Sequence, residues 1–250
     1  MSILHTRRFS SWARGHLLCR TDDATDRFAL TFDDGPNPRA TGAILDVLAR
    51  HGARGTFFML GGNIGRYGDL VRRVASEGHE PAIHGRTHWP LPLLLPGGIR
   101  AQVIRCADQI EAVTGVRPRF YRPPFGFMSP GQARFVRALG YEPVLGDVYP
   151  EDPHRPGTSR IVRRVLPRLR SGSILILHDG SPSGPADRSQ TVEALEIILA
   201  EAARRGWRGT TVSDLLQRAG GPAWHGGCSR DAAGDQGCAD AHAPTQRSPS

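Results

Sequence analysis

The sequence predicts an α/β fold, a parallel sheet or barrel in which seven strands alternate with helices. Three observations carry this prediction. Short apolar runs recur along the chain, segments with helical periodicity separate them, and glycine follows most of the helical segments. The expected strands are residues 27–32, 56–60, 80–83, 119–121, 142–148, 173–177 and 209–212. The expected helices are residues 39–51, 67–77, 99–114, 130–139, 159–169 and 191–205.

Helices are expected where apolar residues recur every three or four positions, because this spacing gathers them on one face. The positions are Ile44, Leu45 and Leu48 in the first helix, Leu70, Val71 and Val74 in the second, and Val103, Ala107, Ile110 and Val113 in the third. Glycine at positions 52, 78, 115, 140 and 206 marks helix ends. Strands are expected between these ends, where apolar and β-branched residues follow one another without a helical period.

The composition is that of a globular protein, with 39% hydrophobic and 22% charged residues among 250. No apolar run approaches the roughly 20 residues of a membrane span. We expect one domain at residues 26–219, a disordered leader at 1–25 and a disordered tail at 220–250. The leader lacks the apolar stretch of a secretory signal, so we expect by default a cytoplasmic protein. We also expect a monomer.

Arginine supplies nearly all of the net charge of +8, and five arginines cluster between residues 160 and 170. The cluster fits a surface for nucleic acid or another anionic polymer, or a solvated helix face. No nucleic-acid motif or stacking aromatic accompanies it, so we expect no nucleic-acid partner. The four cysteines form no zinc pattern, and Cys228 and Cys238 either pair or remain free thiols.

The most informative segment is the end of the first expected strand, where Asp33 and Asp34 precede a Gly-Pro breaker. Adjacent carboxylates repel each other unless a cation or a shared proton relieves them. In α/β folds the carboxyl ends of strands carry the chemistry. A solvated turn is the alternative for an isolated Asp-Asp pair.

Two imidazoles, His84 and His88, follow the third expected strand four residues apart. In a helical turn this spacing places both on one face, so that their nitrogens can converge on one ion. Two histidines and one carboxylate form a common set for a catalytic metal with an open position. The pair is expected at the same end of the sheet as Asp33 and Asp34, and an ordinary surface or core histidine pair is the alternative.

Charged and imidazole side chains also follow the later strands. Arg122 begins a stretch with two prolines after the fourth strand, Asp152 follows the fifth, and His178 ends the sixth. A buried apolar strand that delivers a histidine to its end suggests an acid or base. The concentration of such groups at one rim predicts an active site there.

These residues resemble the NodB-type polysaccharide deacetylases, carbohydrate esterase family four, over residues 28–216. The five family motifs correspond in order to residues 31–36, 84–88, 122–125, 146–153 and 175–179. The resemblance implies a distorted (β/α)7 barrel. It also implies a metal-dependent hydrolase that removes N-acetyl groups from an acetylated amino sugar or polysaccharide, such as a chitin oligomer or a peptidoglycan-like chain, and releases acetate.

The resemblance implies that Asp33 is the general base and that Asp34, His84 and His88 bind a divalent metal. Zn²⁺ is the expected ion, and Co²⁺, Mn²⁺ and Ni²⁺ are alternatives because this donor set suits several metals. Arg122 would orient Asp33.

The resemblance further implies that His178 is the general acid and that Asp152 tunes it. Leu175 or Leu177 would line the pocket for the acetyl group. The backbone N–H of Phe125 would hold the oxyanion, although the family more often has tyrosine at this position.

The fourth motif departs from the family pattern, because Gly146 and Pro153 stand where the family has tryptophan. Trp89 is either a substitute for the aromatic wall of the sugar groove or a packed rim residue. The missing tryptophans leave open the hydrolysis of a non-sugar amide such as a cyclic imide or ureide. An inactive carbohydrate-binding relative is a third alternative, and it would require a broken metal set.

Overall fold

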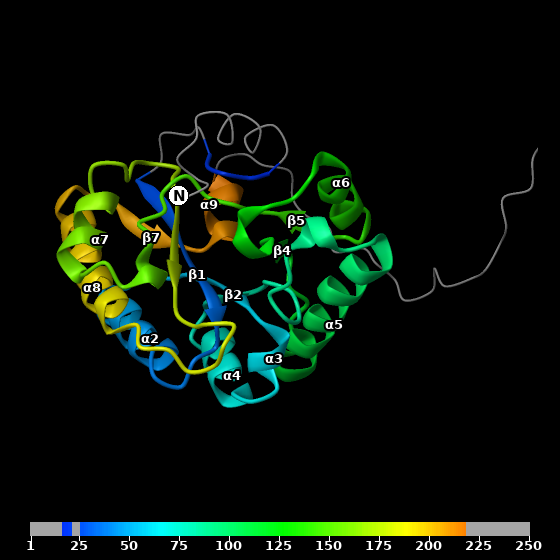
Figure 1. Ribbon diagram of the computed structural model, residues 1–250. Helices are drawn as coiled ribbons and strands as arrows, with labels where there is room; N and C mark the ends of the chain where they lie inside the picture. Colours follow the sequence, from blue (N-terminus) through cyan, green and yellow to red (C-terminus); the bar gives the residue numbers. More distant parts are fainter. Residues whose placement is uncertain (1–16, 22–25, 219–250) are drawn as a thin grey trace, which may run out of the picture.

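The computed structural model describes residues 17–21 and 26–218, and within them seven strands form one curled parallel sheet (Figure 1). The strands are β1 (Arg27–Gly35), β2 (Thr56–Met59), β3 (Glu80–Ile83), β4 (Phe120–Tyr121), β5 (Glu142–Pro143), β6 (Ile174–His178) and β7 (Arg208–Thr210). Their order is β5-β4-β3-β2-β1-β6, and β7 pairs with the first residues of β1. The predicted alternation of strands and helices is confirmed.

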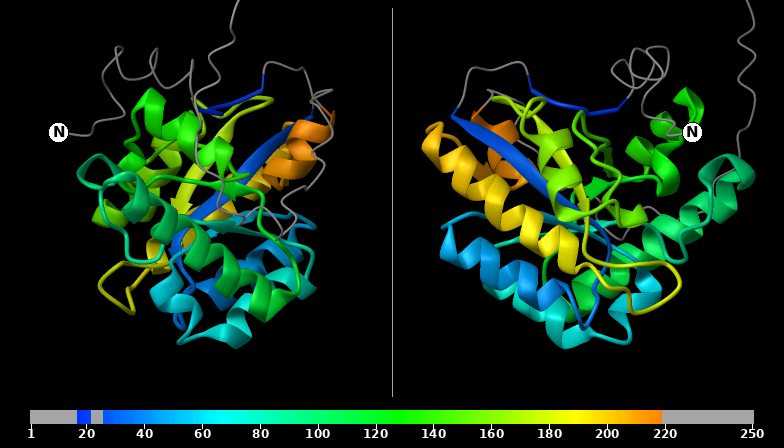
Figure 2. Two further views of the ribbon diagram at one scale, coloured as in Figure 1. Left: turned by 90° about the vertical axis from the view of Figure 1, so that its right-hand side faces the viewer. Right: turned by 60° about the vertical axis from the view of Figure 1, so that its left-hand side comes forward.

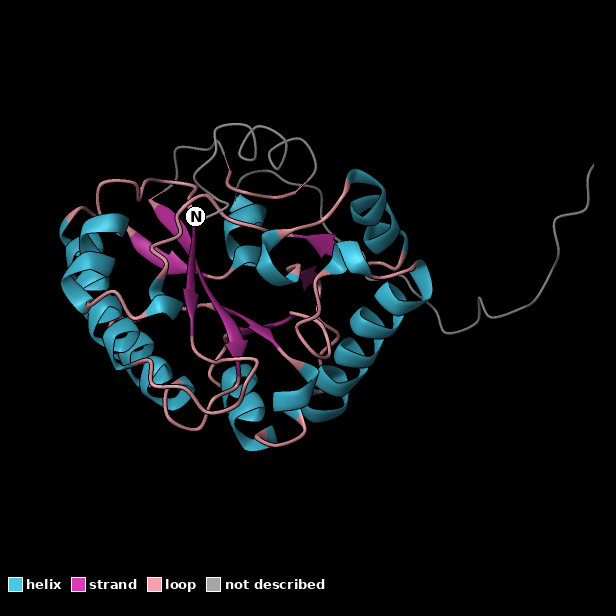
Figure 3. Cartoon of the chain, in the orientation of Figure 1, coloured by secondary structure: helices cyan, strands magenta, loops and turns pink. Residues whose placement is uncertain are grey.

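Helices surround the sheet (Figure 3). They are α2 (Thr41–Arg50), α3 (Gly61–Ile64), α4 (Gly68–Ser76), α5 (Pro96–Thr114), α6 (Pro130–Ala138), α7 (Thr158–Val165), α8 (Ser189–Arg204) and α9 (Val212–Arg218). The predicted helices all occur with ends shifted by a few residues, whereas α3 and α9 have no predicted counterpart. Helices α2 and α8 run side by side on one flank of the molecule (Figure 2).

Strand β1 pairs with three other strands and is buried along nearly its whole length. It pairs with β6 along one edge, while β2 and β7 share the other edge. Phe28, Leu30 and Phe32 are fully buried in the hydrophobic core. The two aspartates therefore lie at the carboxyl end of the most extensively paired strand.

The sheet curls until its two outer strands approach each other, and an irregular segment closes the gap between β5 and β6. We call residues 144–153 the seam. One isolated bridge, Val148 to Leu175, links the seam to β6, and the Ile176 N–H donates to the Val148 carbonyl at 2.9 Å. The curled parallel sheet with its outer helices is the expected distorted barrel.

The fifth strand is shorter than predicted, because it ends at Pro143 instead of continuing to residue 148. A proline cannot donate to the ladder, and Gly146 takes a φ of 144°, outside the range of a regular strand. Arg164 on α7 contacts the irregular segment, donating to the Pro150 carbonyl at 2.7 Å and pairing with Glu151 at 2.8 Å. One arginine of the basic cluster thus supports the seam.

Residues 17–21 were predicted as part of a leader, but they lie along the sheet. Leu18 forms a bridge with Val144, Arg20 forms one with Ser173, and Leu17 and Cys19 are buried. The remaining residues of the predicted leader, 1–16 and 22–25, lie outside the described residues. So does the predicted tail at 220–250, which contains Cys228 and Cys238. In the described part of the chain, none of the helices has the length and apolarity needed to cross a membrane.

Candidate functional site

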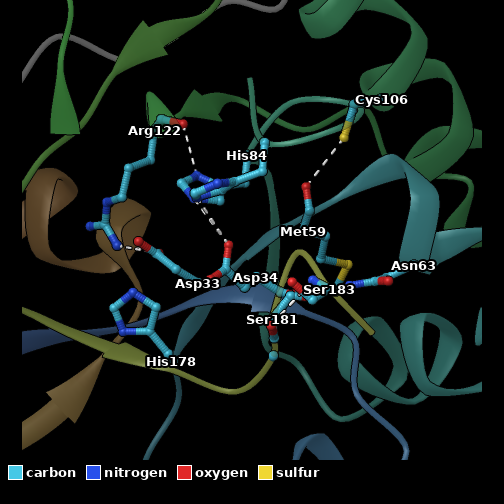
Figure 4. A network of polar contacts seen from close by, with 12 residues as sticks. Asp33, Asp34, Met59, Asn63, His84, Cys106, Arg122, His178, Ser181 and Ser183 are labelled. Carbon is cyan, nitrogen blue, oxygen red and sulfur yellow. Dashed lines mark hydrogen bonds and ion pairs between the residues drawn. The ribbon is translucent and has the colours of Figure 1, made fainter. Parts of the chain in front are cut away.

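Asp33 and Asp34 both line one cavity at the carboxyl end of the sheet. Consecutive residues of a regular strand point to opposite faces. Here the register with β2 shifts between Asp33 and Gly35, and Asp34 has a left-handed φ of 71°. This bulge lets both carboxylates reach the same cavity (Figure 4).

Asp34 faces two imidazoles, as the sequence predicted. Its Oδ1 atom lies 3.5 Å from His84 Nε2 and 3.3 Å from His88 Nε2. The same oxygen is buried and lacks a hydrogen-bond partner in the described part of the chain. One ligand atom from each of the three residues falls within a cluster 4.8 Å across. This donor set and the orphaned oxygen fit a divalent cation.

The protonation states also suit a metal. Burial, followed by the charge of Arg122, lowers the pKa of His84 to about 3. Burial and the neighbouring His84 lower the pKa of His88 to about 3. The Nδ1 atom of His84 lies 2.9 Å from the Arg122 carbonyl, so Nδ1–H donates and Nε2 keeps its lone pair for the cavity. Burial raises the pKa of Asp34 to about 6, and a bound cation would favour its ionised form.

Arg122 points toward Asp33 from the end of β4 (Figure 4). Its Nη1 atom donates to Asp33 Oδ1 at 2.6 Å and to the Thr31 hydroxyl at 2.7 Å. The guanidinium lies over the ring of Phe58, 4.0 Å from its centroid, and also donates to the Leu145 carbonyl. Arg122 and Asp33 are both at least 95% buried, so the ion pair fixes the position of the carboxylate.

His178 ends β6 on the other side of Asp33 and binds Asp152. Its Nδ1 atom lies 3.0 Å from Asp152 Oδ1, and its backbone N–H donates to Oδ2 at 2.9 Å. Thr191 donates its hydroxyl to the same Oδ2 at 2.9 Å. Burial opposes a charge on the imidazole, but Asp152 and then Asp33 outweigh it and raise the pKa of His178 to about 9. His178 is therefore an imidazolium near neutral pH and a donor at Nε2.

The cavity has a volume of about 750 Å³ and an apolar wall made by Leu145, Tyr149 and Ile176. Leu175 and Leu177, expected to line the pocket for the acetyl group, lie instead in the hydrophobic core. The side-chain period of two explains the difference, because the strand turns Ile176 toward the cavity and its neighbours away from it.

The two aromatic residues expected at the site differ in placement. Phe125 lines the cavity with a φ of 60°, and its ring contacts that of His88 with centroids 4.5 Å apart. Trp89 is 55% exposed and does not line the cavity. Left-handed conformations at Asp34, His88 and Phe125 concentrate backbone strain at the site, as is common where function constrains geometry.

Gly146 cannot carry the side chain that the family motif has at this position. A Cβ atom there would lie 2.7 Å from Ile176 Cγ1 and 2.8 Å from the Ile174 carbonyl oxygen. Pro153, the other departure, lines the cavity together with Glu151 and His154. The seam therefore replaces a tryptophan wall by a backbone that packs directly on β6.

Several residues of the cavity are absent from the predicted site. They include Leu145, Tyr149, Glu151, His154, Ile176, Ser181, Pro182 and Arg188. Strand alternation from His178 would have found Ile176. Arg188 precedes α8, and nothing in its local sequence separates it from a surface arginine at a helix start.

Comparison with known proteins agrees with this site. A family model described as polysaccharide deacetylase matches residues 20–144. A chitooligosaccharide deacetylase of Bradyrhizobium sp. (strain ANU 289) is 38% identical over 186 residues, which cover 71% of this chain and 85% of the relative. A peptidoglycan-N-acetylglucosamine deacetylase of Bacillus cereus is 37% identical over 191 residues, with coverages of 76% and 87%. The crystal structure of a peptidoglycan N-acetylglucosamine deacetylase matches with a TM-score of 0.77 and 29% identity, covering 83% of this chain and 96% of that one.

Proposed function

The chain belongs to the polysaccharide deacetylase family, enzymes that act on amide bonds, and we propose that it is a metal-dependent N-deacetylase of chitooligosaccharides or peptidoglycan-like chains. The observation that carries the proposal is the buried Asp34 oxygen facing two neutral imidazoles, with Asp33 and His178 lining the same cavity. The products are acetate and a free amino sugar.

Asp34, His84 and His88 would hold the divalent cation. When bound, such an ion lowers the pKa of a coordinated water and polarises the substrate carbonyl. Zn²⁺ is the expected ion, and the same donors accept Co²⁺, Mn²⁺ or Ni²⁺. The intact set argues against an inactive carbohydrate-binding relative.

Asp33 would accept the proton of the attacking water. Arg122 suits this assignment, because the buried ion pair at 2.6 Å binds one oxygen of the carboxylate and so orients the other. The Phe125 backbone N–H would donate to the oxyanion of the tetrahedral intermediate, a contribution of roughly 10²–10³ in rate for one donor.

His178 would then protonate the leaving amine. The Asp152 carboxylate fixes the tautomer with Nδ1–H, so that the second proton stands on Nε2. The proposed base, Asp33, and the proposed acid, His178, thus line the same cavity, as the reaction requires. The apolar wall at Leu145 and Ile176 provides a surface for a methyl group.

The test is acetate release from N-acetylglucosamine oligomers by metal-stripped protein, with and without added Zn²⁺ or Co²⁺. Metal-restored release is the expected result. The Asp33→Asn variant, which keeps the three ligands, should retain metal and lose turnover. Absence of release with metal bound contradicts the sugar substrate, and assays with small cyclic imides and ureides then test the alternative amides.

A further inference from the structure

Arg188 is a buried charge in the cavity that the proposed reaction does not use. It lies immediately before α8, is 7% exposed and lines the cavity with Asp33 and His178. A buried guanidinium is costly unless its N–H groups are satisfied. The partners that satisfy it are therefore informative.

The guanidinium of Arg188 links the segment that follows His178 to the segment that follows Asp152. Its Nε and Nη2 atoms donate to the Gly180 carbonyl at 3.0 and 2.6 Å, and its Nη1 atom donates to the Pro153 carbonyl at 3.0 Å. Gly180 lies two residues after His178, and Pro153 directly follows Asp152. One side chain thus binds the backbone next to both His178 and Asp152.

Gly180 transmits this anchoring to β1. Its N–H donates to the Asp33 carbonyl at 3.2 Å, and a Cβ atom on it would lie 2.0 Å from the Asp34 carbonyl oxygen. Only glycine permits this backbone-to-backbone contact. The peptide that Arg188 anchors therefore adds a restraint between His178 and the double aspartate to the pairing of Asp33 with His178 in the sheet.

The first turn of α8 adds a second attachment, the hydrogen bond from Thr191 to Asp152. We propose that Arg188 is a positioning residue that keeps the Asp152–His178 pair in register with Asp33 and Asp34. It acts through the backbone of Gly180 and Pro153 and needs no contact with the substrate. The proposal rests on the proposed function, in which His178 delivers a proton.

The decisive variant is Arg188→Lys, which keeps the charge but cannot bind two carbonyls with a planar fork. We expect kcat for acetate release to fall about 10- to 100-fold, since a misplacement near 1 Å costs about that much. KM and bound metal should change less than about threefold. Arg155→Lys is the matched control, because Arg155 is exposed and pairs with Asp187 in the same loop. It should leave all three values unchanged.

A double-mutant cycle separates positioning from general destabilisation. In a His178→Asn background, Arg188→Lys should have almost no further effect, because the group that it positions is gone. An undiminished loss in that background, or a wild-type kcat in Arg188→Lys, overturns the proposal. If Arg188→Lys does not fold, Arg188→Gln, with a donor for only one of the carbonyls, enters the same cycle.

An activity-independent measurement keeps the proposal separate from the proposed function. The Nδ1–H proton of His178, bound to Asp152, should give a protected proton NMR signal that His178→Asn removes. We expect the signal in wild type and Arg155→Lys and its loss or broadening in Arg188→Lys. An unchanged signal in Arg188→Lys contradicts the proposal even if wild type hydrolyses no acetylated sugar, whereas that inactivity contradicts only the function.

Discussion

Replacement of Asp152 by asparagine should convert the imidazolium of His178 into a neutral ring with the wrong tautomer. Both oxygens of the carboxylate accept hydrogen bonds, from the His178 ring, from the His178 backbone and from Thr191. An amide has only one oxygen. If that oxygen serves the backbone N–H, the NH₂ group faces Nδ1 and forces it to be an acceptor.

The magnitude follows from the raised pKa. The pKa of His178 lies at about 9, against 6.5 for an ordinary histidine, although burial acts in the opposite direction. The difference corresponds to about 3 kcal/mol of preference for the charged ring. Without the Asp152 charge the pKa should fall to 6.5 or below. At pH 8 the protonated fraction then drops from about 90% to about 3%, roughly a 30-fold loss.

The assay is the pH dependence of kcat for acetate release from N-acetylglucosamine oligomers, with the enzyme loaded with metal. The alkaline limb should move to lower pH in Asp152→Asn, and the deficit should shrink as the pH falls toward 6. The Thr191→Val variant removes a hydrogen-bond donor to Asp152 Oδ2 but no charge, so it should shift the alkaline limb of the pH profile far less. An alkaline limb that stays in place in Asp152→Asn would refute the assignment of His178.

Three other predictions concern metal binding and stability. His84→Ala should reduce bound metal in elemental analysis to background while the far-ultraviolet circular dichroism stays native, and retained stoichiometric metal would contradict the ligand assignment. Burial lowers the pKa of His79 to about 4, and its Nδ1 accepts from the Gly55 N–H at 3.2 Å. The unfolded chain therefore binds more protons between pH 6.5 and 4, and falling pH should remove about 3 kcal/mol of stability across this window. Urea unfolding should show a smaller loss in His79→Asn, and an equal loss would exclude His79 as its origin. Gly146→Ala should lower the free energy of unfolding by about 2 kcal/mol or more, because its Cβ meets Ile176 at 2.7 Å and its φ is 144°. An unchanged melting temperature would contradict this.

The central strands and most helices followed from local patterns, because apolar periodicity and glycine stops record burial directly. The short elements could not be predicted from local patterns. Helix α3 has four residues, too few for a period, and β5 ends where Pro143 removes a donor. The position of residues 17–21 beside the sheet depends on isolated bridges to Val144, just after β5, and Ser173, just before β6, and no local pattern encodes such distant partners.

The grouping of Asp33, Asp34, His84, Arg122 and His178 could be predicted, since polar side chains at the ends of parallel strands meet at one edge. The orientation of single side chains could not. The bulge that turns Asp34 into the cavity is a property of pairing with β2. On β6 the predicted pocket residues, Leu175 and Leu177, are each one position away from Ile176, which lines the cavity. A shift of one residue along a strand moves a side chain to the opposite face of the sheet.

The two sides of the cavity are built from different kinds of backbone. Asp33, Asp34 and His178 stand on β1 and β6, and His84 and Arg122 directly follow β3 and β4, where paired strands hold them, whereas Asp152 lies in the seam. Much of the facing wall belongs to the seam, an irregular segment that meets β6 through the bridge from Val148 to Leu175 and through the N–H groups of Asp147 and Val148, which donate to the Ile174 carbonyl. Substitutions at Tyr149, which lines the cavity directly after these contacts, can therefore change the wall and leave the seam backbone on β6 in place. Within one scaffold, the shape of the cavity wall and the geometry of the reaction centre are separable.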